Sequence, residues 1–196
     1  MSNVLKLKSG FEKEPDLEKL TSAFQAMKDG KNDLSRKILQ ELIDDGSLWS
    51  LVYLGDIYYS ELNYDKALEY YSLAAIKGSI SGEFYRARLF YTIGKYNEAF
   101  LAFSKLSEKG LPTAKYWLYM LYRNKYINNL SKTKAISLLF QAADSGHLYA
   151  QREKAMLYLK GKMGFWRIPI GLFFLVKMIQ NAVKISKLDD KVEYTI

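Results

Sequence analysis

The sequence predicts an all-α protein, a right-handed α-solenoid of antiparallel helix pairs that ends in an apolar C-terminal helix. Glycines recur at intervals of 32, 32 and 36 residues, at Gly46, Gly78, Gly110 and Gly146. Small residues also recur within the repeats, twelve residues apart in the first two cases: Gly55 with Ala67, and Ala87 with Ala99. A glycine just past a helix permits the left-handed turn that ends it, and paired small residues let two helices approach closely. No stretch has a convincing strand pattern.

The chain begins with a polar lead-in, residues 1–15, which lacks the continuous apolar core of a secretory signal. We therefore expect a cytoplasmic protein, with attachment to the periphery of a membrane as an option. The first hairpin, about residues 16–46, pairs Asp16–Lys28 with Asn32–Asp44 and has Ala23 and Ser35 at the small positions. Its higher charge suits a repeat that caps one end of an array.

The second hairpin, residues 47–78, shows the repeat most plainly. Two helical patterns, Trp49–Tyr59 and Tyr64–Ile76, are joined by a short polar turn. The apolar side chains expected to pack across the pair are Leu51, Leu54 and Tyr58 on the first helix and Ala67, Tyr71 and Ala74 on the second. Neither helix buries its apolar face alone, so the pair is the folding unit.

The later hairpins vary this pattern. Residues 79–110 keep it, whereas residues 111–146 carry four extra residues in the turn and place Tyr119 where a small residue is expected. We therefore expect looser or rotated helix packing around Tyr119. A further hairpin starts at His147 and departs from the pattern after Gly161.

Two stretches carry a family resemblance. LVYLGDIYYSELNYDKALEYYSLAAIKG and KTKAISLLFQAADSGHLYAQREKAMLYLKG share a closing glycine, AA and KA pairs and recurring tyrosines. In these features the chain resembles Sel1-like repeats, relatives of the tetratricopeptide (TPR) repeats, over residues 16–161. The resemblance implies a TPR-like helical repeat domain and a scaffold or adaptor role in protein–protein interaction.

The net charge of +8 is distributed unevenly. Residues 1–110 carry 15 basic and 16 acidic side chains, a balance of −1, whereas residues 111–196 carry 14 and 5, a balance of +9. An acidic or anionic partner is therefore expected to approach the C-terminal half.

Catalytic chemistry has little support in the sequence. There is no cysteine, and the single histidine, His147, follows Gly146 at a hairpin junction, where a solvated or helix-starting role is expected. We expect no enzyme activity, no cofactor and no metal site. The basic residues form no recognisable nucleic-acid module, so the sequence argues against nucleic-acid binding.

Protein partners are expected along the first helix of each hairpin, the inner side of a curved array. The side chains predicted to face this groove are Trp49, Val52, Asp56, Tyr59, Phe84, Arg88, Tyr91, Tyr116, Met120, Arg123, Tyr149, Arg152 and Met156. Arginine beside tyrosine suits a carboxylate, a phosphate or a peptide, because guanidinium donates paired hydrogen bonds and also stacks. The competing interpretation is that most of these aromatic side chains only pack the hairpins.

The segment 162–187 is apolar and amphipathic, and a tail, residues 188–196, follows it. Pro169 can start a helix, and Lys177, Gln180, Asn181 and Lys184 fall on one narrow polar face. The residues expected to dock on a membrane or a partner are Phe165, Trp166, Arg167, Phe173, Phe174, Lys177 and Lys184.

Three roles for this segment remain open. It could lie in the interface of an anionic membrane, tethering a surface-polysaccharide or secretion assembly; it could cap the repeat array; or it could dock on a protein partner, including a second copy in a homo-oligomer. A membrane-spanning helix is disfavoured, because the uninterrupted apolar run 168–176 is too short.

Overall fold

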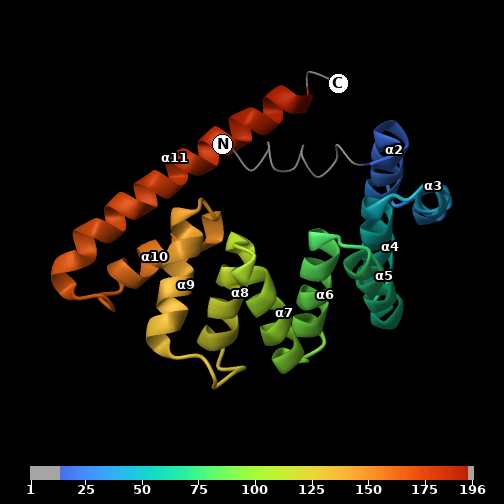
Figure 1. Cartoon of the computed structure of the whole chain (residues 1–196). Helices are drawn as coiled ribbons and strands as arrows, with labels where there is room; N and C mark the ends of the chain where they lie inside the picture. The colour runs from blue at the N-terminus through green and yellow to red at the C-terminus, as the bar shows by residue number, and fades with distance from the viewer. Residues whose placement is uncertain (1–13, 194–196) are drawn as a thin grey trace. The chain divides into compact units, whose positions relative to one another are not determined.

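The fold is seen in a computed structural model that describes residues 14–193, with side chains described as far as residue 183. Within that range the secondary structure consists of ten α-helices and one 3-10 helix, without a β-strand (Figure 1). The chain divides into two compact units, Met1–Ala102 and Phe103–Ile196. The predicted all-α repeat fold is therefore confirmed.

The helices follow one another as antiparallel pairs. In the first unit they are α2 (Leu17–Lys28), α3 (Asn32–Asp44), α4 (Leu48–Ser60), α5 (Tyr64–Ile76) and α6 (Ile80–Thr92). Helix α7 (Tyr96–Glu108) contains the boundary between the units, and the second unit continues with α8 (Pro112–Arg123), α9 (Lys132–Asp144), α10 (Leu148–Leu159), η1 (Phe165–Arg167) and α11 (Ile168–Glu193). The helices predicted for the first two hairpins begin and end within one residue of these bounds.

The repeating glycines end helices as expected. Gly78 has φ +92°, its amide donates to the carbonyl of Ala75, and the next amide donates to the carbonyl of Ala74. This is the Schellman arrangement, which satisfies carbonyls that the helix leaves unpaired. Leu62 (φ +60°) and Lys125 (φ +58°) take the same left-handed conformation without being glycine, which the sequence did not indicate.

Serine hydroxyls start several helices. Ser47, Ser79 and Ser131 each accept a hydrogen bond from the amide three residues later, at 3.1, 3.1 and 3.3 Å. Each bond satisfies an amide that has no partner within the helix. Pro112 occupies the first turn of α8, where a missing amide hydrogen has no cost.

Close helix approach in the first unit depends on the small residues. The buried Ser35 hydroxyl of α3 donates to the carbonyl of Ala23 in α2 at 2.8 Å. In the next hairpin, a Cβ at Gly55 would lie only 2.4 Å from the Tyr71 ring. Gly55 therefore provides the space that the buried tyrosine fills.

In the second unit, Tyr119 lies inside the core and is 5% exposed. Its cluster contains four alanines together with Leu139: Ala135, Ala142, Ala143 and Ala150. The room that glycine provides on α4 is provided here by alanines on α9 and α10.

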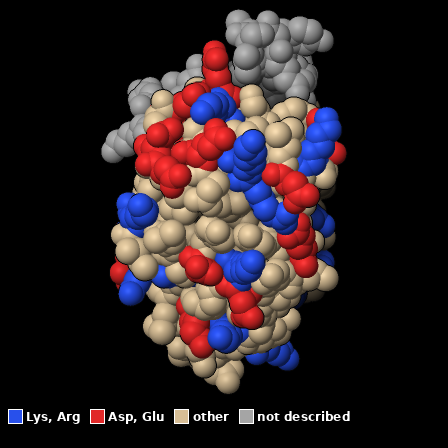
Figure 2. Space-filling view, turned by 90° about the vertical axis from the view of Figure 1, so that its right-hand side faces the viewer, with Lys and Arg blue, Asp and Glu red and all other residues tan. Residues whose placement is uncertain are grey.

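On the face that Figure 2 shows, acidic and basic side chains are mixed, with other residues between them. Arg36 contacts both Asp33, at 2.7 Å, and Glu61, and Lys19 lies 3.4 Å from Glu41. Exposed pairs of this kind add little stability. This mixed surface does not resemble the C-terminal region, where basic residues predominate.

Candidate functional site

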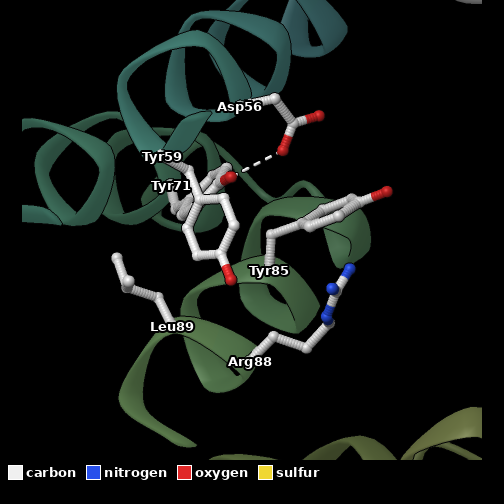
Figure 3. Close-up of a pocket in the computed structure, with 6 residues that line it drawn as sticks. All are labelled: Asp56, Tyr59, Tyr71, Tyr85, Arg88 and Leu89. Atoms are coloured by element: carbon white, nitrogen blue, oxygen red, sulfur yellow. Dashed lines mark hydrogen bonds between the residues drawn. The ribbon is translucent and has the colours of Figure 1, made fainter. Parts of the chain in front are cut away.

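The first unit contains a hollow of about 280 Å³ that is lined by three successive helices (Figure 3). Helix α4 contributes Asp56 and Tyr59, α5 contributes Tyr71, and α6 contributes Tyr85, Arg88 and Leu89. We call these six residues the tyrosine hollow. Since α4 packs against both α5 and α6, the hairpin repeat itself brings these side chains together.

Asp56 is held in place by α5, the second helix of its hairpin. The buried Tyr71 hydroxyl donates to its Oδ1 at 2.5 Å, and the other carboxylate oxygen points away from Tyr71 (Figure 3). Burial raises the pKa of Asp56 above its ordinary value, although the Tyr71 hydroxyl and the Arg88 guanidinium act in the opposite direction. Burial and the neighbouring Asp56 also raise the pKa of Tyr71, so this hydroxyl stays protonated and acts as a donor.

The α6 side of the hollow combines a cation with an aromatic ring. The Arg88 guanidinium lies 5.5 Å from the centroid of the Tyr85 ring, and this ring stacks on Tyr71 with centroids 5.6 Å apart. Tyr59 completes the wall, with its hydroxyl 3.5 Å from that of Thr92. The hollow therefore presents a carboxylate, a guanidinium and tyrosine hydroxyls against flat apolar rings.

The second unit carries a separate aromatic and charged surface. The Tyr116 ring lies 4.7 Å from the His147 ring and 6.3 Å from the Tyr149 ring, between centroids. Arg123 forms a 3.0 Å ion pair with Glu153, and Arg152 is exposed on the same helix as Glu153. Burial raises the pKa of Tyr116, and Glu153 raises it further, while Arg123 and Arg152 lower it by less.

His147 begins α10, as expected for a helix-starting residue. Its Nδ1 accepts a hydrogen bond from the Ala150 amide at 3.2 Å, so the imidazole needs its neutral form there. Burial lowers the pKa of His147, which favours that neutral form.

The residues predicted to face the groove lie in different surroundings in the structure. Asp56, Tyr59 and Arg88 meet in the tyrosine hollow, and Tyr116, Arg123, Tyr149 and Arg152 lie on α8 and α10. Trp49 packs against the core and lies 5.8 Å from the Tyr53 ring, while Phe84, Tyr91, Met120 and Met156 are half-buried. The placement of Val52 in the groove was wrong, because this side chain is completely buried in the core.

Sequence reasoning missed three residues of the hollow and one ion-pair partner. Tyr71 was expected only as a packing residue, and Tyr85, Leu89 and Glu153 were not singled out. The spacing of Tyr85 from Arg88 and Leu89 is a helical signal that places them on one face. No local pattern indicates that the Tyr71 hydroxyl reaches Asp56 on another helix.

Helix α11 packs against α10 along one face. Gly171 is buried there, and a Cβ on it would lie 2.9 Å from the backbone nitrogen of Leu159. The Phe174 ring lies 5.5 Å from the Tyr158 ring, and Asn181 donates to the side chain of Gln151 at 3.3 Å. We call the face with Gly171, Phe174 and Asn181 the docked face.

A buried lysine adds to this contact. Lys154 of α10 is 7% exposed and forms a 2.6 Å ion pair with Asp144. Its Nζ also lies 4.8 and 4.5 Å from the centroids of Phe140 and Phe174. Of the residues predicted to dock on a membrane or partner, Phe174 therefore faces α10.

Another face of α11 is apolar and exposed. We call it the outer stripe, and it consists of Leu172, Phe173, Val176, Ile179 and Val183, which are between 48% and 62% exposed. Phe165 and Trp166 lie just before the helix and are 78% and 80% exposed. Arg167 and Lys177 are also exposed, whereas the side chain of Lys184 lies outside the described residues.

Two kinds of feature are absent from the described part of the chain. None of its helices combines the length and the apolar character that crossing a membrane requires. In the same residues, no group of three or more histidine or acidic side chains is arranged to hold a metal ion.

Solved structures share the fold of this chain. A protective antigen of uropathogenic Escherichia coli displaying an SLR fold is 24% identical, with a TM-score of 0.55. A Sel1 repeat protein from Oxalobacter formigenes is 21% identical, with a TM-score of 0.59. MamA from Desulfovibrio magneticus RS-1 is 11% identical, with a TM-score of 0.55 over 85% of this chain and 94% of its own.

The matches to the first two structures cover 65% and 73% of this chain but only 29% and 63% of the other chains. No protein-family model matches the sequence, and no curated protein does so either. At these identities the likeness concerns the fold, which agrees with the hairpins, glycine turns and small-residue contacts described above. The chain is a helical-repeat protein with the fold of the Sel1-like and TPR-like repeats.

Proposed function

We propose that this protein is a non-enzymatic adaptor that holds a segment of another protein along the first helices of its hairpins. The observation that carries the proposal is the tyrosine hollow, because three successive helices converge there on one polar site. Proteins with this kind of fold are typically non-catalytic interaction scaffolds, which agrees with that role.

The chemistry of the hollow suits a polypeptide. A peptide backbone offers alternating donors and acceptors, and the hollow is lined by the Asp56 carboxylate, the Arg88 guanidinium and the hydroxyls of Tyr59 and Tyr85. Tyrosine rings add flat contact area with little loss of conformational freedom. On the second unit, the exposed Arg152 and Tyr149 supply the same combination of charge and ring.

Substituting the arginines tests this proposal. Arg88→Ala, Arg123→Ala and Arg152→Ala variants, together with Asp56→Asn, are compared with the wild type by crosslinking and mass spectrometry in the native cell. Lys37→Ala, an exposed charge change on α3, is the matched control. We expect the groove variants to lose a specific set of crosslinks that the control keeps. Unchanged crosslinks in all four variants would remove both the tyrosine hollow and the surface of α8 and α10 from the proposal.

A second candidate function is supported by the C-terminal region. The outer stripe and the basic residues around it suit a peripheral membrane tether, for example in surface-polysaccharide or secretion assembly. A cytoplasmic protein attached to the inner membrane surface would fit this role. Flotation of the full chain with phosphatidylserine vesicles tests it, and a protein that stays in the soluble fraction at low salt is not such a tether.

A further inference from the structure

We infer that α11 lies in the plane of an anionic bilayer with its outer stripe in the acyl boundary while its docked face stays on α10. This inference rests on the second function above. It adds the lipid chemistry, the orientation of the helix on the bilayer, and the claim that α11 stays in contact with α10 when the membrane is bound.

The first step of the argument is the separation of the two faces. Gly171 and Phe174 face α10, whereas Leu172 and Val176 are about half exposed and one helical turn apart on another side. Contact with α10 therefore leaves the outer stripe uncovered. A helix that meets two partners on two faces can bind both at once.

The second step is the charge. From Lys154 to Leu188 the sequence contains no aspartate or glutamate and seven lysines and arginines. Of these, Lys160, Lys162, Arg167 and Lys177 are exposed. Anionic headgroups attract basic residues near the surface, and each contributes about fivefold to membrane affinity.

The third step compares the lipid surface with a second copy of the chain. Pairing two outer stripes would bring together two segments that carry basic residues and, as far as Leu188, no acidic ones, so their charges would repel. An anionic bilayer instead provides the apolar phase and the opposite charge together. Phe165 and Trp166, the most exposed large apolar side chains of this region, would then lie at the level of the headgroups, where tryptophan is favoured.

Vesicle flotation with matched variants tests the contact surface. Vesicles of phosphatidylcholine, with or without phosphatidylserine, are mixed with the full chain at low salt. We expect binding only when phosphatidylserine is present, and loss of binding in Trp166→Ser/Phe173→Ser. The control Ile76→Ser/Leu101→Ser changes two apolar residues that are 79% and 61% exposed elsewhere and should bind normally.

Neutralising two charges provides a second measurement. Arg167→Gln/Lys177→Gln should weaken the affinity by about thirtyfold, whereas Lys37→Gln/Lys132→Gln should leave it nearly unchanged. Equal affinity of all four double variants would overturn the inference. So would a dimer of the wild type in sedimentation velocity that Trp166→Ser/Phe173→Ser converts to a monomer without any vesicle binding.

A covalent bridge tests whether α11 stays on α10. The chain has no native cysteine, and the side chains of Gln151 and Asn181 are 3.3 Å apart, so a short bismaleimide can join Gln151→Cys to Asn181→Cys. We expect the bridged protein to float as well as the unbridged one. Loss of flotation on bridging would overturn the docked orientation while leaving the tether function. If even the wild type fails to float, the tether and this inference both fail, and the adaptor function is unaffected.

Discussion

Replacing Gly55 with alanine tests the close helix contact behind the tyrosine hollow. A Cβ at this position would lie 2.4 Å from Cε1 and 2.5 Å from Cδ1 of Tyr71, whereas carbon atoms normally stay about 3.5 Å or more apart. The tyrosine ring cannot move away easily. It is 2% exposed, its hydroxyl is bonded to Asp56, and it stacks on Tyr85.

Two opposing effects decide how much Gly55→Ala changes the free energy of unfolding. Overpacking a well-filled core costs about 1–3 kcal/mol, and the held ring places this substitution in the upper part of that range. Alanine instead of glycine inside a helix stabilises the helix by about 0.8–1.0 kcal/mol. We expect Gly55→Ala to lower the free energy of unfolding by about 1–2 kcal/mol, or the melting temperature by about 2–8 °C.

The assay is urea unfolding followed by circular dichroism, in the wild-type and the Tyr71→Leu backgrounds. Without the ring, Gly55→Ala should be neutral or slightly stabilising, so the two substitutions should show a coupling of about 1–3 kcal/mol. A Gly55→Ala variant that is as stable as the wild type would refute the reasoning. An equal loss in both backgrounds would also do so, because the cost would then not come from Tyr71.

Three further predictions concern the backbone and two titrating groups. Leu62→Gly should raise the free energy of unfolding by about 1 kcal/mol, because leucine is strained at φ +60° and this side chain is 71% exposed; a loss in urea unfolding would contradict this. The pKa of His147 is lower in the folded than in the unfolded chain, so the wild type should lose stability as pH falls through about 6.5. In His147→Asn the asparagine can still accept from the Ala150 amide but does not titrate. Melting curves of this variant should therefore lack the pH-dependent loss of stability. Asp56 has a raised pKa in the folded chain, so the stability of the wild type relative to Asp56→Asn should increase as pH falls toward 3.8. If the difference in unfolding free energy between the two proteins does not change with pH, Asp56 is not buried in its ionised form.

The hairpins could be predicted from the sequence because their determinants are local. Gly78 ends a helix, Ser79 starts the next, and the apolar positions between such signals recur with the helical period. The pairing of Gly55 with Ala67 likewise needs only the length of one hairpin. The limits of the helices and the repeat fold follow from such signals.

The composition of the tyrosine hollow could not be predicted in the same way. Val52 and Asp56 are one turn apart on α4, yet the structure buries the first completely and places the second in the hollow. This difference depends on which side chains of α5 and α6 lie next to each position. An error of a fraction of a turn in the register moves a side chain from the surface to the core.

For α11, the sequence by itself determined an apolar segment that forms a helix and contains no acidic residue before Asp189. Only the tertiary structure decided which of its apolar side chains contact α10 and which remain exposed. Gly171 sets the docked face, because it alone allows the backbone of α11 to approach Leu159 so closely, and Phe174 then follows one turn later. Apolar character is a property of a residue, but burial is a property of its neighbours, and the neighbours of α11 belong to another helix.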